Sequence, residues 1–237
     1  IDLNNINNIN WEEQSIAILG AGISGLGATK LALHLKANVL LSDIKENKIS
    51  IAKTNKFKYE YFGHSDAVLK SDLIIKSPGI PNRIDIIKRS KKKKIPIVSE
   101  IEFASWFSKS DIIALTGSNG KTTTVQLIFE IFKRSQKDVL LGGNVGISYS
   151  ENVLYERQTK KSYIHILEIS SYQAEYLYHF NPKISCLLNI SEDHMDRYSN
   201  MNDYITAKLN ITKKLSKKTI LLYNGDDKFL SKRIQPN

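Results

Sequence analysis

The sequence predicts an α/β protein with parallel sheets, and three observations carry that prediction. Short apolar segments alternate with helical stretches along the chain, which is the pattern of βα units. A glycine-rich loop follows an apolar segment twice, at 20–25 and at 116–122. Polar clusters stand directly after the apolar segments, where strands of a parallel sheet place their ligands. We therefore expect a Rossmann-like parallel-sheet domain over residues 1–109, followed by part of a P-loop-type α/β domain over residues 110–237.

The first half of the chain supplies the elements of the first domain. "SIAILG" (15–20) is an apolar run of strand length, and the alanine- and leucine-rich stretch 24–36 predicts a helix. Further strands are predicted at 38–43, 72–79 and 95–99, with a helix between the last two. The alternation starts afresh after "SEIEFASWF", so we place the domain boundary near Ser108 to Asp111.

The second half repeats the alternation. "DIIALTG" (111–117) predicts a strand, and residues 121–134 predict a helix. Further strands are predicted at 138–144, 163–170, 183–191 and 219–226, and a further helix at 202–214. Four of the apolar runs end in polar clusters: "TGSNGKT", "GGN", "EISS" and "ISEDH". Because the carboxyl ends of parallel strands share one edge of a sheet, these clusters predict a single shared site.

Composition excludes several classes of protein. The 237 residues include one cysteine, Cys186, which cannot form an internal disulfide and fits a small buried apolar side chain in a reducing compartment. The apolar runs are too short to cross a bilayer, and no charged start precedes an apolar signal segment. We expect a cytoplasmic, monomeric protein without a membrane span.

The formal net charge of +10 raises the question of nucleic-acid binding. The lysines are spread along the chain, and the one dense run, "KRSKKKK" at 88–94, contains no aromatic residue that could stack on a base. We interpret this run as a solvated helix end and expect no nucleic-acid partner.

"TGSNGKTT" (116–123) fits a loop whose backbone N–H groups wrap phosphate oxygens at a helix N-terminus. Its two glycines permit close backbone approach, Lys121 would reach the terminal phosphates, and Thr122 would offer a hydroxyl to Mg²⁺. Leu115 stands where the common spacing has its first glycine, so the loop is a shorter variant. The alternative is a glycine turn that happens to precede lysine and threonine.

"GAGISG" (20–25) matches G-x-G-x-x-G between a strand and a helix, and Asp43 ends the next strand. The spacing is close to the roughly 20 residues expected for an acid that holds a ribose hydroxyl. Alone, this fingerprint predicts a nicotinamide-dependent oxidoreductase. The geometry recognises a diphosphate and a ribose, however, and a sugar nucleotide satisfies the same loop. The second half of the chain favours a UDP-type ligand.

Two acidic clusters and one lysine complete the candidate site. Glu168 ends the strand "YIHILE" and either ligates Mg²⁺ opposite the phosphate loop or is a surface acid at a strand end. The loop "NISEDHMDRY" (189–198) places His194 among acids, although a helix-capping turn produces the same density. Lys208 falls in the middle of an apolar helical stripe. Such a lysine usually extends to water, and the alternative is an amine inside the site.

Together these motifs resemble the Mur ligases, ATP-dependent enzymes that build the peptide of the bacterial cell-wall precursor. The resemblance is carried, in order along nearly the whole chain, by "SPGIP" (77), "SEIEFA" (99), "TGSNGKTT" (116), "GGNVG" (142), "LEISSYQ" (167), "NISEDHMDRY" (189) and "YITAKLNI" (204). The phosphate loop is shared with folylpolyglutamate synthases. "LEISSYQ" with "EDHMDRY" is similar to the branch that adds D-glutamate.

The resemblance implies roles for residues of the second domain. One Mg²⁺ would be held by Thr122 and Glu168, and a second by His194 and Lys208, with the lysine carrying a carbamate. The residues implied as catalytic are Lys121, Asn144, His194 and Lys208. Those implied for ATP are Thr116, Gly117, Ser118, Asn119, Gly120, Lys121, Thr122 and Thr123.

Substrate-binding residues are implied in both domains. Asn144, Ser170 and Gln173 would position the muramoyl-alanine end of the substrate. The positions that match the family's UDP site are Ile23, Ser24, Asp43, Ser77 and Gly79. Ile44 departs from the pattern, because the family often has a hydroxyl residue after this aspartate, and the uracil contacts of that turn are therefore in doubt.

The implied reaction uses ATP to phosphorylate the L-alanine carboxylate of UDP-N-acetylmuramoyl-L-alanine. The amine of D-glutamate then attacks the acyl phosphate to give an amide, ADP and phosphate. Two Mg²⁺ ions and Lys121 would neutralise the charge that builds between two anions.

Family members are longer, three-domain chains, so we expect this chain to be a fragment without the C-terminal domain and unable to ligate alone. The competing interpretations are a nicotinamide-dependent oxidoreductase that uses "GAGISG", a non-catalytic nucleotide-binding module, and another Mur-type or folylpolyglutamate ligase.

Overall fold

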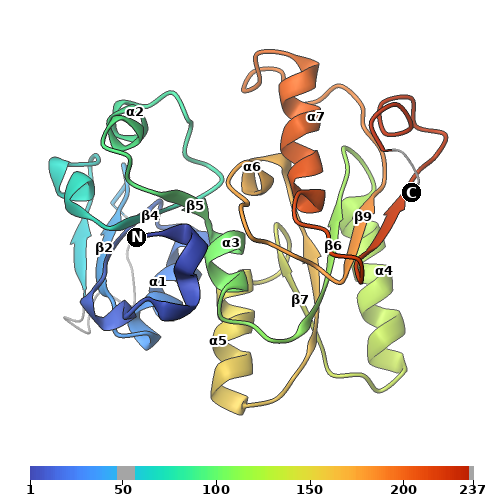
Figure 1. Ribbon diagram of the computed structural model, residues 1–237, viewed down its shortest axis with the longest axis horizontal. Helices are drawn as coiled ribbons and strands as arrows, with labels where there is room; N and C mark the ends of the chain where they lie inside the picture. The colour runs from blue at the N-terminus through green and yellow to red at the C-terminus, as the bar shows by residue number, and fades with distance from the viewer. Residues whose placement is uncertain (47–56, 235–237) are drawn as a thin grey trace. The chain divides into compact units, whose positions relative to one another are not determined.

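The computed structural model describes residues 1–46 and 57–234, which fall into two compact units (Figure 1). The first unit comprises Ile1–Phe107 with Ser148–Tyr155, and the second comprises Ser108–Ile147 with Glu156–Asn237. Each unit contains a five-stranded sheet whose strands pair in parallel. The predicted α/β fold with parallel sheets is therefore confirmed. The assignment of functional domains to 1–109 and 110–237 stays a prediction.

The first unit has the strand order β3-β2-β1-β4-β5. Its elements are η1 (Leu3–Asn8), η2 (Trp11–Glu13), β1 (Ser15–Leu19), α1 (Ile23–His34), β2 (Asn38–Ser42), β3 (Lys58–Glu60), η4 (Asp66–Lys70), β4 (Leu73–Lys76), α2 (Asp85–Lys92), β5 (Ile97–Ser99) and α3 (Glu100–Ser105). The strands β1 and β4 are almost fully buried, as expected for central strands covered on both faces. The strands that follow β1 pair first on one side of it and then on the other, so the strand order reverses between β1 and β4. In open parallel sheets, this is the position where ligands usually bind.

Two glycines shape the turn between β1 and α1. Gly20 has a φ of +94°, a left-handed conformation that glycine adopts without strain. A Cβ at Gly25 would lie 1.7 Å from the carbonyl oxygen of Gly20, so only glycine lets the helix start this close to the strand. This is the role that the G-x-G-x-x-G pattern predicts for its last glycine.

The second unit has the strand order β10-β9-β6-β8-β7. Its elements are β6 (Asp111–Thr116), α4 (Lys121–Arg134), β7 (Val139–Gly143), α5 (Tyr149–Thr159, of which the first part belongs to the first unit), β8 (Ile164–Glu168), α6 (Ser171–Ala174), β9 (Ile184–Leu187), α7 (Met201–Leu209), η5 (Asn210–Thr212) and β10 (Ile220–Tyr223). The central strand β6 pairs with β8 on one side and β9 on the other. The carboxyl ends of these three strands therefore meet at one edge, as the sequence predicts.

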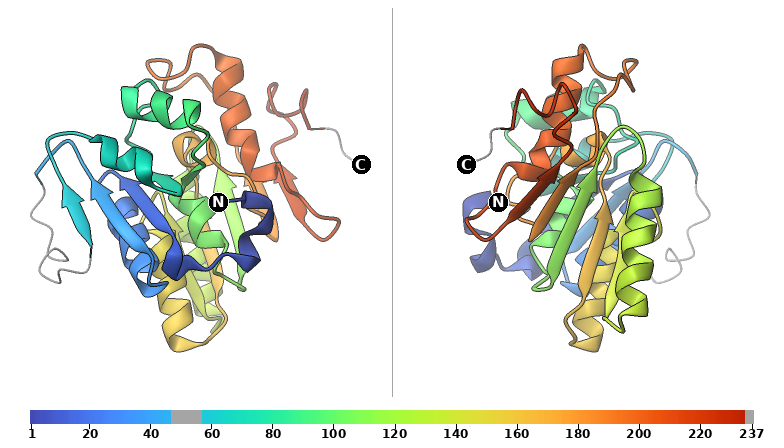
Figure 2. Two further views of the ribbon diagram at one scale, coloured as in Figure 1. Left: turned by 60° about the vertical axis from the view of Figure 1, so that its left-hand side comes forward. Right: turned by 90° about the vertical axis from the view of Figure 1, so that its right-hand side faces the viewer.

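The core of the second unit lies between its sheet and α4, which runs along the strands in Figure 2. Ile113, Leu115, Val125 and Ile166 form its buried centre. The edge strand β10 is less buried than the central strands. Its alternate residues Ile220 and Leu222 each keep 51% of their surface exposed.

Several elements differ from the sequence prediction. The three-residue strand β3, the helix α5 and the one-turn helix α6 were not predicted, because "KYE" contains no apolar run and α5 lacks a clear apolar face. The helix expected over 202–214 ends at Leu209 and continues as the 3-10 turn η5. The basic run 88–94 includes the last residues of α2 and is mostly exposed, as predicted. Across the described part of the chain, every helix falls short of the length and apolar content that a membrane span requires.

Candidate active site

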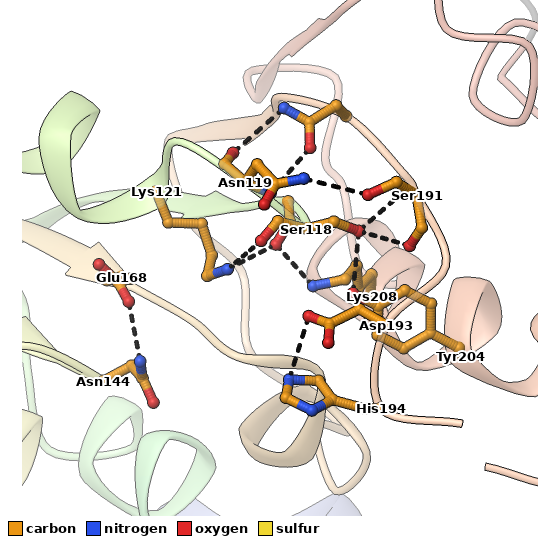
Figure 3. Close-up of polar contacts among 12 residues, drawn as sticks. Ser118, Asn119, Lys121, Asn144, Glu168, Ser191, Asp193, His194, Tyr204 and Lys208 are labelled. Carbon is orange, nitrogen blue, oxygen red and sulfur yellow. Dashed lines mark hydrogen bonds and ion pairs between the residues drawn. The ribbon is translucent and has the colours of Figure 1, made fainter. Parts of the chain in front are cut away.

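The loop 117–120 follows β6 directly and leads into α4, so it lies at the carboxyl edge of the second sheet (Figure 3). Gly120 is the N-cap of α4 and has a φ of +78°, a conformation that favours glycine. The first N–H groups of α4 and the positive end of its dipole therefore point toward this edge. The arrangement is that of a phosphate-binding helix N-terminus.

The segment after β9 holds this loop in place. The side chain of Asn189 accepts the Asn119 N–H at Oδ1 (2.9 Å) and donates from Nδ2 to the Asn119 carbonyl (3.1 Å). The Asn189 carbonyl accepts the Ser118 N–H at 2.9 Å. The Ser118 hydroxyl lies in a buried network with the Ser191 backbone and with the Tyr204 hydroxyl, 2.9 Å away. A second strand end thus specifies the conformation of the phosphate loop.

Lys121 is the first residue of α4, and its amine turns back onto the loop. Nζ donates to the carbonyls of Gly117 and Ser118, both at 2.8 Å. Thr116 at the end of β6 donates its hydroxyl to the Ile169 carbonyl at 2.7 Å, and so joins β6 to the segment after β8. Thr123 is exposed on the first turn of α4. The roles of these residues in ATP binding stay predictions.

Glu168 is the centre of a second polar cluster. Its side chain, at the end of β8, is 1% exposed. Thr122 donates its hydroxyl to Oε2 and Asn144 donates from Nδ2 to Oε1, both at 2.8 Å. The end of β7 can approach the end of β8 because Gly143 has no side chain. A Cβ at Gly143 would lie 2.2 Å from the Glu168 carbonyl oxygen. The structure therefore brings together three of the predicted site residues.

Thr122 and Glu168 fit a magnesium site that a phosphate completes. Hydroxyl and carboxylate oxygens are ligands that Mg²⁺ prefers, and proteins usually bind it through one or two carboxylates plus substrate phosphates and water. Within residues 1–46 and 57–234, no three His, Cys, Asp or Glu side chains gather closely enough to hold a metal by themselves. The donor set thus favours a nucleotide-bound Mg²⁺ over a metal held by protein alone.

Lys208 lies inside the site and does not extend to water. The side chain is 1% exposed, its amine donates to the Gly117 carbonyl at 2.7 Å, and it lies 4.8 Å from the Tyr204 ring centre. Burial, followed by the charge of Lys121, lowers the pKa of Lys208 to about 7, although Asp193 and Glu168 oppose the shift. A substantial fraction of the buried amine is therefore neutral near neutral pH.

His194 sits on the other side of Asp193 in the loop after β9 (Figure 3). Its Nε2 lies 3.3 Å from Asp193 Oδ2, and its ring packs on Tyr172 with centres 4.8 Å apart. The backbone of His194 has a φ of +58°, which is strained for a residue other than glycine. Such strain concentrates at functional sites. Asp193 lies between Lys208 and His194 in Figure 3, and the shared role of the lysine and the histidine in metal binding stays a prediction.

Ser170 and Gln173 use their polar groups to begin α6. The Ser170 hydroxyl and the Gln173 side chain form a reciprocal capping box, with the Gln173 Oε1 accepting the Ser170 N–H at 3.0 Å. Gln173 is 2% exposed. The predicted contact of these two residues with substrate stays a prediction, and the capping box is a sufficient structural reason for both residue types.

The predicted UDP-binding residues of the first unit surround the loop between β1 and α1. Ile23 begins α1 and is 65% exposed, and the Ser77 hydroxyl donates to the Gly20 carbonyl at 3.3 Å. The Asp43 carboxylate accepts the N–H groups of Ala21 (2.5 Å) and Lys45 (2.9 Å). Asp43 therefore orders the glycine loop, and its contact with a ribose stays a prediction. The remaining two predicted residues, Ser24 and Gly79, lie respectively in the first turn of α1 and in the exposed turn after β4.

Sequence reasoning missed three residues that shape the site: Asn189, Asp193 and Tyr204. Asp193 lies in the acidic loop 189–198, whose density a helix-capping turn also explains, and Tyr204 lies on the same predicted helix as Lys208. Asn189 gave one usable signal, since it is the first polar residue after a buried strand at the edge where ligands bind.

Comparisons with known proteins agree with the motifs. The family description "Mur ligase middle domain" matches residues 115–237. The UDP-N-acetylmuramoylalanine–D-glutamate ligase of Lachnoclostridium phytofermentans is 38% identical over 229 residues, covering 94% of this chain and 50% of the relative. The ligase of the same name from Christiangramia forsetii is 37% identical over 229 residues, covering 94% and 51%. The chain thus spans about half the length of the curated relatives it matches.

Solved structures show the same fold. UDP-N-acetylmuramate:L-alanyl-gamma-D-glutamyl-meso-diaminopimelate ligase from Neisseria meningitides gives a TM-score of 0.62 at 17% identity, over 92% of this chain and 74% of that one. UDP-N-acetylmuramate-alanine ligase from Thermotoga maritima gives 0.56 at 18% identity, over 93% and 51%. With the family description matching from the end of β6 onward, the chain belongs to the Mur ligase family.

Proposed function

We propose that this chain provides the UDP-substrate-binding and ATP-phosphate-binding parts of a ligase that adds D-glutamate to UDP-N-acetylmuramoyl-L-alanine. In this proposal residues 1–109 hold the UDP part of the substrate, and residues 110–237 hold the ATP phosphates. The reaction joins the L-alanine carboxylate to the D-glutamate amine through an acyl phosphate. Its nucleotide substrates place the reaction in the cytoplasm.

One observation supports the ATP half above all. The loop 117–120 precedes the N-terminus of α4, and Lys121 and Lys208 both donate to the Gly117 carbonyl, at 2.8 and 2.7 Å. The Lys121 amine and the N-terminus of α4 together form a site for a highly charged anion. When a triphosphate binds, the Lys121 amine would leave the loop carbonyls and donate to the phosphate oxygens instead.

The Thr122–Glu168 pair would hold Mg²⁺ on the same phosphates, and Mg²⁺ would supply charge neutralisation at the transferred phosphoryl group. Asn144 fixes the Glu168 carboxylate by its 2.8 Å hydrogen bond. A pair of donors to one carboxylate sets the direction of its remaining lone pairs.

We propose that Lys208 is carbamylated and that it serves a second Mg²⁺ with His194. A protonated amine has no lone pair for a metal, and only a neutral amine reacts with CO₂. The geometry supports this, since the amine is buried at 2.7 Å from the loop carbonyl, and its pKa of about 7 makes the neutral form accessible near neutral pH. The carbamate would replace a cation by an anionic oxygen ligand.

The chain's residues position two anions that repel each other. The phosphate loop and Lys121 orient the outer phosphate, while the edge of the sheet near Asn144 and His194 would receive the L-alanine carboxylate. Electrostatic stabilisation of this kind is usually the largest part of catalysis in phosphoryl and acyl transfer. The 38% identity to ligases named for D-glutamate supports this amino acid as the second substrate.

Thermal-shift measurements on the chain test the two ligand assignments separately. UDP-N-acetylmuramoyl-L-alanine is expected to raise the melting temperature, and NADH is not. Stabilisation by NADH alone would overturn the UDP assignment in favour of an oxidoreductase. Lys121→Ala is expected to remove stabilisation by MgATP and to keep stabilisation by the UDP substrate, with the exposed Lys137→Ala as the matched control.

A further inference from the structure

The phosphate loop contains a chemically labile pair of residues. The sequence has two Asn-Gly pairs, Asn119–Gly120 in the loop before α4 and Asn224–Gly225 after β10. Asparagine is a thermolabile residue, and it is most labile before glycine, because a residue without a side chain leaves its backbone nitrogen able to attack the asparagine carboxamide. All four residues are exposed. Each pair is therefore a candidate for deamidation.

The backbone nitrogen of Gly120 is accessible. A Cβ at Gly120 would have Leu188 as its nearest neighbour, at 3.7 Å, so the space beside this part of the backbone is open. As the N-cap of α4, Gly120 has no helical acceptor for its N–H. Among the described residues, no other group accepts that N–H either. The attacking nitrogen is thus neither shielded nor hydrogen-bonded.

The carboxamide of Asn119 is held weakly. Its Nδ2 donates to the Ser191 hydroxyl at 3.1 Å (Figure 3), and both residues are exposed, so water can replace this neutral hydrogen bond at little cost. The backbone of Asn119 is held more firmly, by two hydrogen bonds to the Asn189 side chain. These two bonds restrain the rotation that brings the carboxamide carbon onto the Gly120 nitrogen, and they therefore set the rate.

We propose that Asn119 is a site of spontaneous deamidation that disables the phosphate loop, and that a bound nucleotide protects it. In the first step the Gly120 nitrogen loses its proton and bonds to Cγ of Asn119, while the Cγ–Nδ2 bond breaks and ammonia leaves with that proton. Water then opens the resulting succinimide ring and leaves aspartate or isoaspartate at position 119. Water is the only other reactant.

Either product opposes the anion that the loop would bind. Aspartate adds a negative charge one residue before the N-cap of α4, where it competes with phosphate for the helix N-terminus and for the Lys121 amine. Isoaspartate also inserts one methylene group into the main chain and displaces the N–H groups of the loop. The chemistry at Asn119 stands without the proposed function, whereas its effect on nucleotide binding rests on it.

A bound triphosphate would suppress the reaction. Phosphate oxygens at a helix N-terminus accept the backbone N–H groups of the loop, and that of Gly120 would be among them. Asn224 lies outside this loop, in a turn where its Oδ1 accepts the Asp226 N–H at 3.0 Å. It is therefore an internal control that nucleotide is not expected to protect.

The test is mass spectrometry of the chain after several days at raised temperature, with and without MgATP. Trypsin cuts after lysine and releases residues 110–121 and 219–228 as two peptides, each with a single asparagine. Without nucleotide, the acid is expected to replace the amide in both peptides. MgATP at about ten times its dissociation constant is expected to slow the reaction about tenfold at Asn119 and not at Asn224, because only the unliganded loop reacts.

Two variants test the restraint and the consequence. Asn189→Ala is expected to speed deamidation at Asn119 about fivefold, the equivalent of one neutral hydrogen bond, and to leave Asn224 unaffected. Asn119→Asp, which copies one product, is expected to weaken MgATP binding about tenfold or more in a calorimetric titration, because like charges repel. Asn224→Asp is the matched control and leaves MgATP binding unchanged.

The outcomes separate the inference from the proposed function. An Asn119 that stays intact, whether or not Asn224 reacts, would show that the loop is not a deamidation site, whatever it binds. If MgATP binds and deamidation at Asn119 is equally fast with and without it, or if Asn119→Asp binds MgATP as tightly as the unchanged chain, the inference is wrong and the ATP assignment stands. If Asn119 reacts and the chain binds no MgATP, the modification stands and the ATP assignment is wrong.

Discussion

At the scale of single residues, burial of the Lys208 amine opposes its protonation. A lysine in water titrates near 10.4, whereas burial and the nearby Lys121 lower the pKa of Lys208 to about 7. The unfolded chain therefore holds the proton over a pH range in which the folded chain has released it. A buried lysine of this kind lowers stability and is retained for a chemical role.

Lys208→Met tests this opposition. Between pH 7 and about 10 the unfolded state binds more protons, so the unfolding free energy of the unchanged chain rises with pH. Below pH 7 the amine is charged in both states and the full penalty applies. We expect the methionine variant to be more stable by a few kcal/mol at pH 7, and the difference to shrink toward pH 10, measured by urea unfolding. The exposed Lys214→Met is the control, and a less stable methionine variant at pH 7 would contradict the account.

At the scale of elements, the phosphate loop depends on the strand next to it. Asn189, directly after β9, makes two side-chain hydrogen bonds to Asn119, at 2.9 and 3.1 Å. The backbone of Asn119 has no helix or strand partner at this point, so the side chain supplies what secondary structure does not. The shape of an anion site is thereby set by an element distant in sequence.

Asn189→Ala is expected to loosen this loop without unfolding the sheet. Asn119 is exposed, so water can take over its N–H and carbonyl, and each lost hydrogen bond corresponds to about 0.5–1.5 kcal/mol at most. Amide hydrogen exchange at Asn119 is expected to accelerate, while exchange at β6 and β8 stays unchanged. Equal protection of Asn119 in the variant and the unchanged chain would show that Asn189 does not position the loop.

Glu156 on α5 and His165 on β8 form a buried polar pair beside the start of the second unit. Glu156 accepts hydrogen bonds from the Ser108 hydroxyl (2.7 Å) and the Lys109 N–H (3.1 Å), and it lies 2.8 Å from Nε2 of the fully buried His165. Burial alone would raise the pKa of Glu156, but the hydrogen bonds from His165 and Ser108 outweigh it and leave the pKa below its ordinary value. The ionised carboxylate therefore belongs to the folded state.

Glu156→Gln is expected to lower stability by about 1–3 kcal/mol at pH 7. Because the folded pKa is depressed, the contribution of the carboxylate is complete above about pH 4.3, the unfolded value, and is lost as the pH falls through the folded pKa. Urea unfolding at several pH values measures the difference between the two proteins. A difference that grows as the pH falls below 4 would reverse the predicted sign.

At the scale of the whole molecule, the sequence predicted the sheets well and the loops only in part. Buried parallel strands are continuous apolar runs, so β1, β6 and β8 could be predicted from the sequence. β3 is a three-residue edge strand without such a run, and it could not. The lysine on the apolar stripe of α7 left two interpretations open, since periodicity alone cannot tell a buried amine from one that reaches water. Burial at that position depends on the loop 117–120, which is far away in sequence.

Among the site residues too, those marked by a motif could be predicted and those placed by tertiary contacts could not. The phosphate loop, Thr122 and Glu168 were found because motif and strand end coincide. Asn189 and Tyr204 were not, because their roles arise from contacts with Asn119 and Ser118 that only the three-dimensional arrangement creates. Of the two glycine loops, the first carries a signature that several ligands share, which is why the oxidoreductase interpretation remained open until the family was known.

The central claim is that the edge formed by β6, β8 and β9 binds a magnesium-complexed triphosphate. The most direct test is a titration of the ¹⁵N-labelled chain with MgATP, which detects weak binding by amide chemical shifts. The account predicts Mg²⁺-dependent shifts at Gly117, Gly120 and Lys121, and their loss in Glu168→Gln. Shifts confined to the loop 20–25, or shifts at 117–121 that are the same without Mg²⁺, would contradict it.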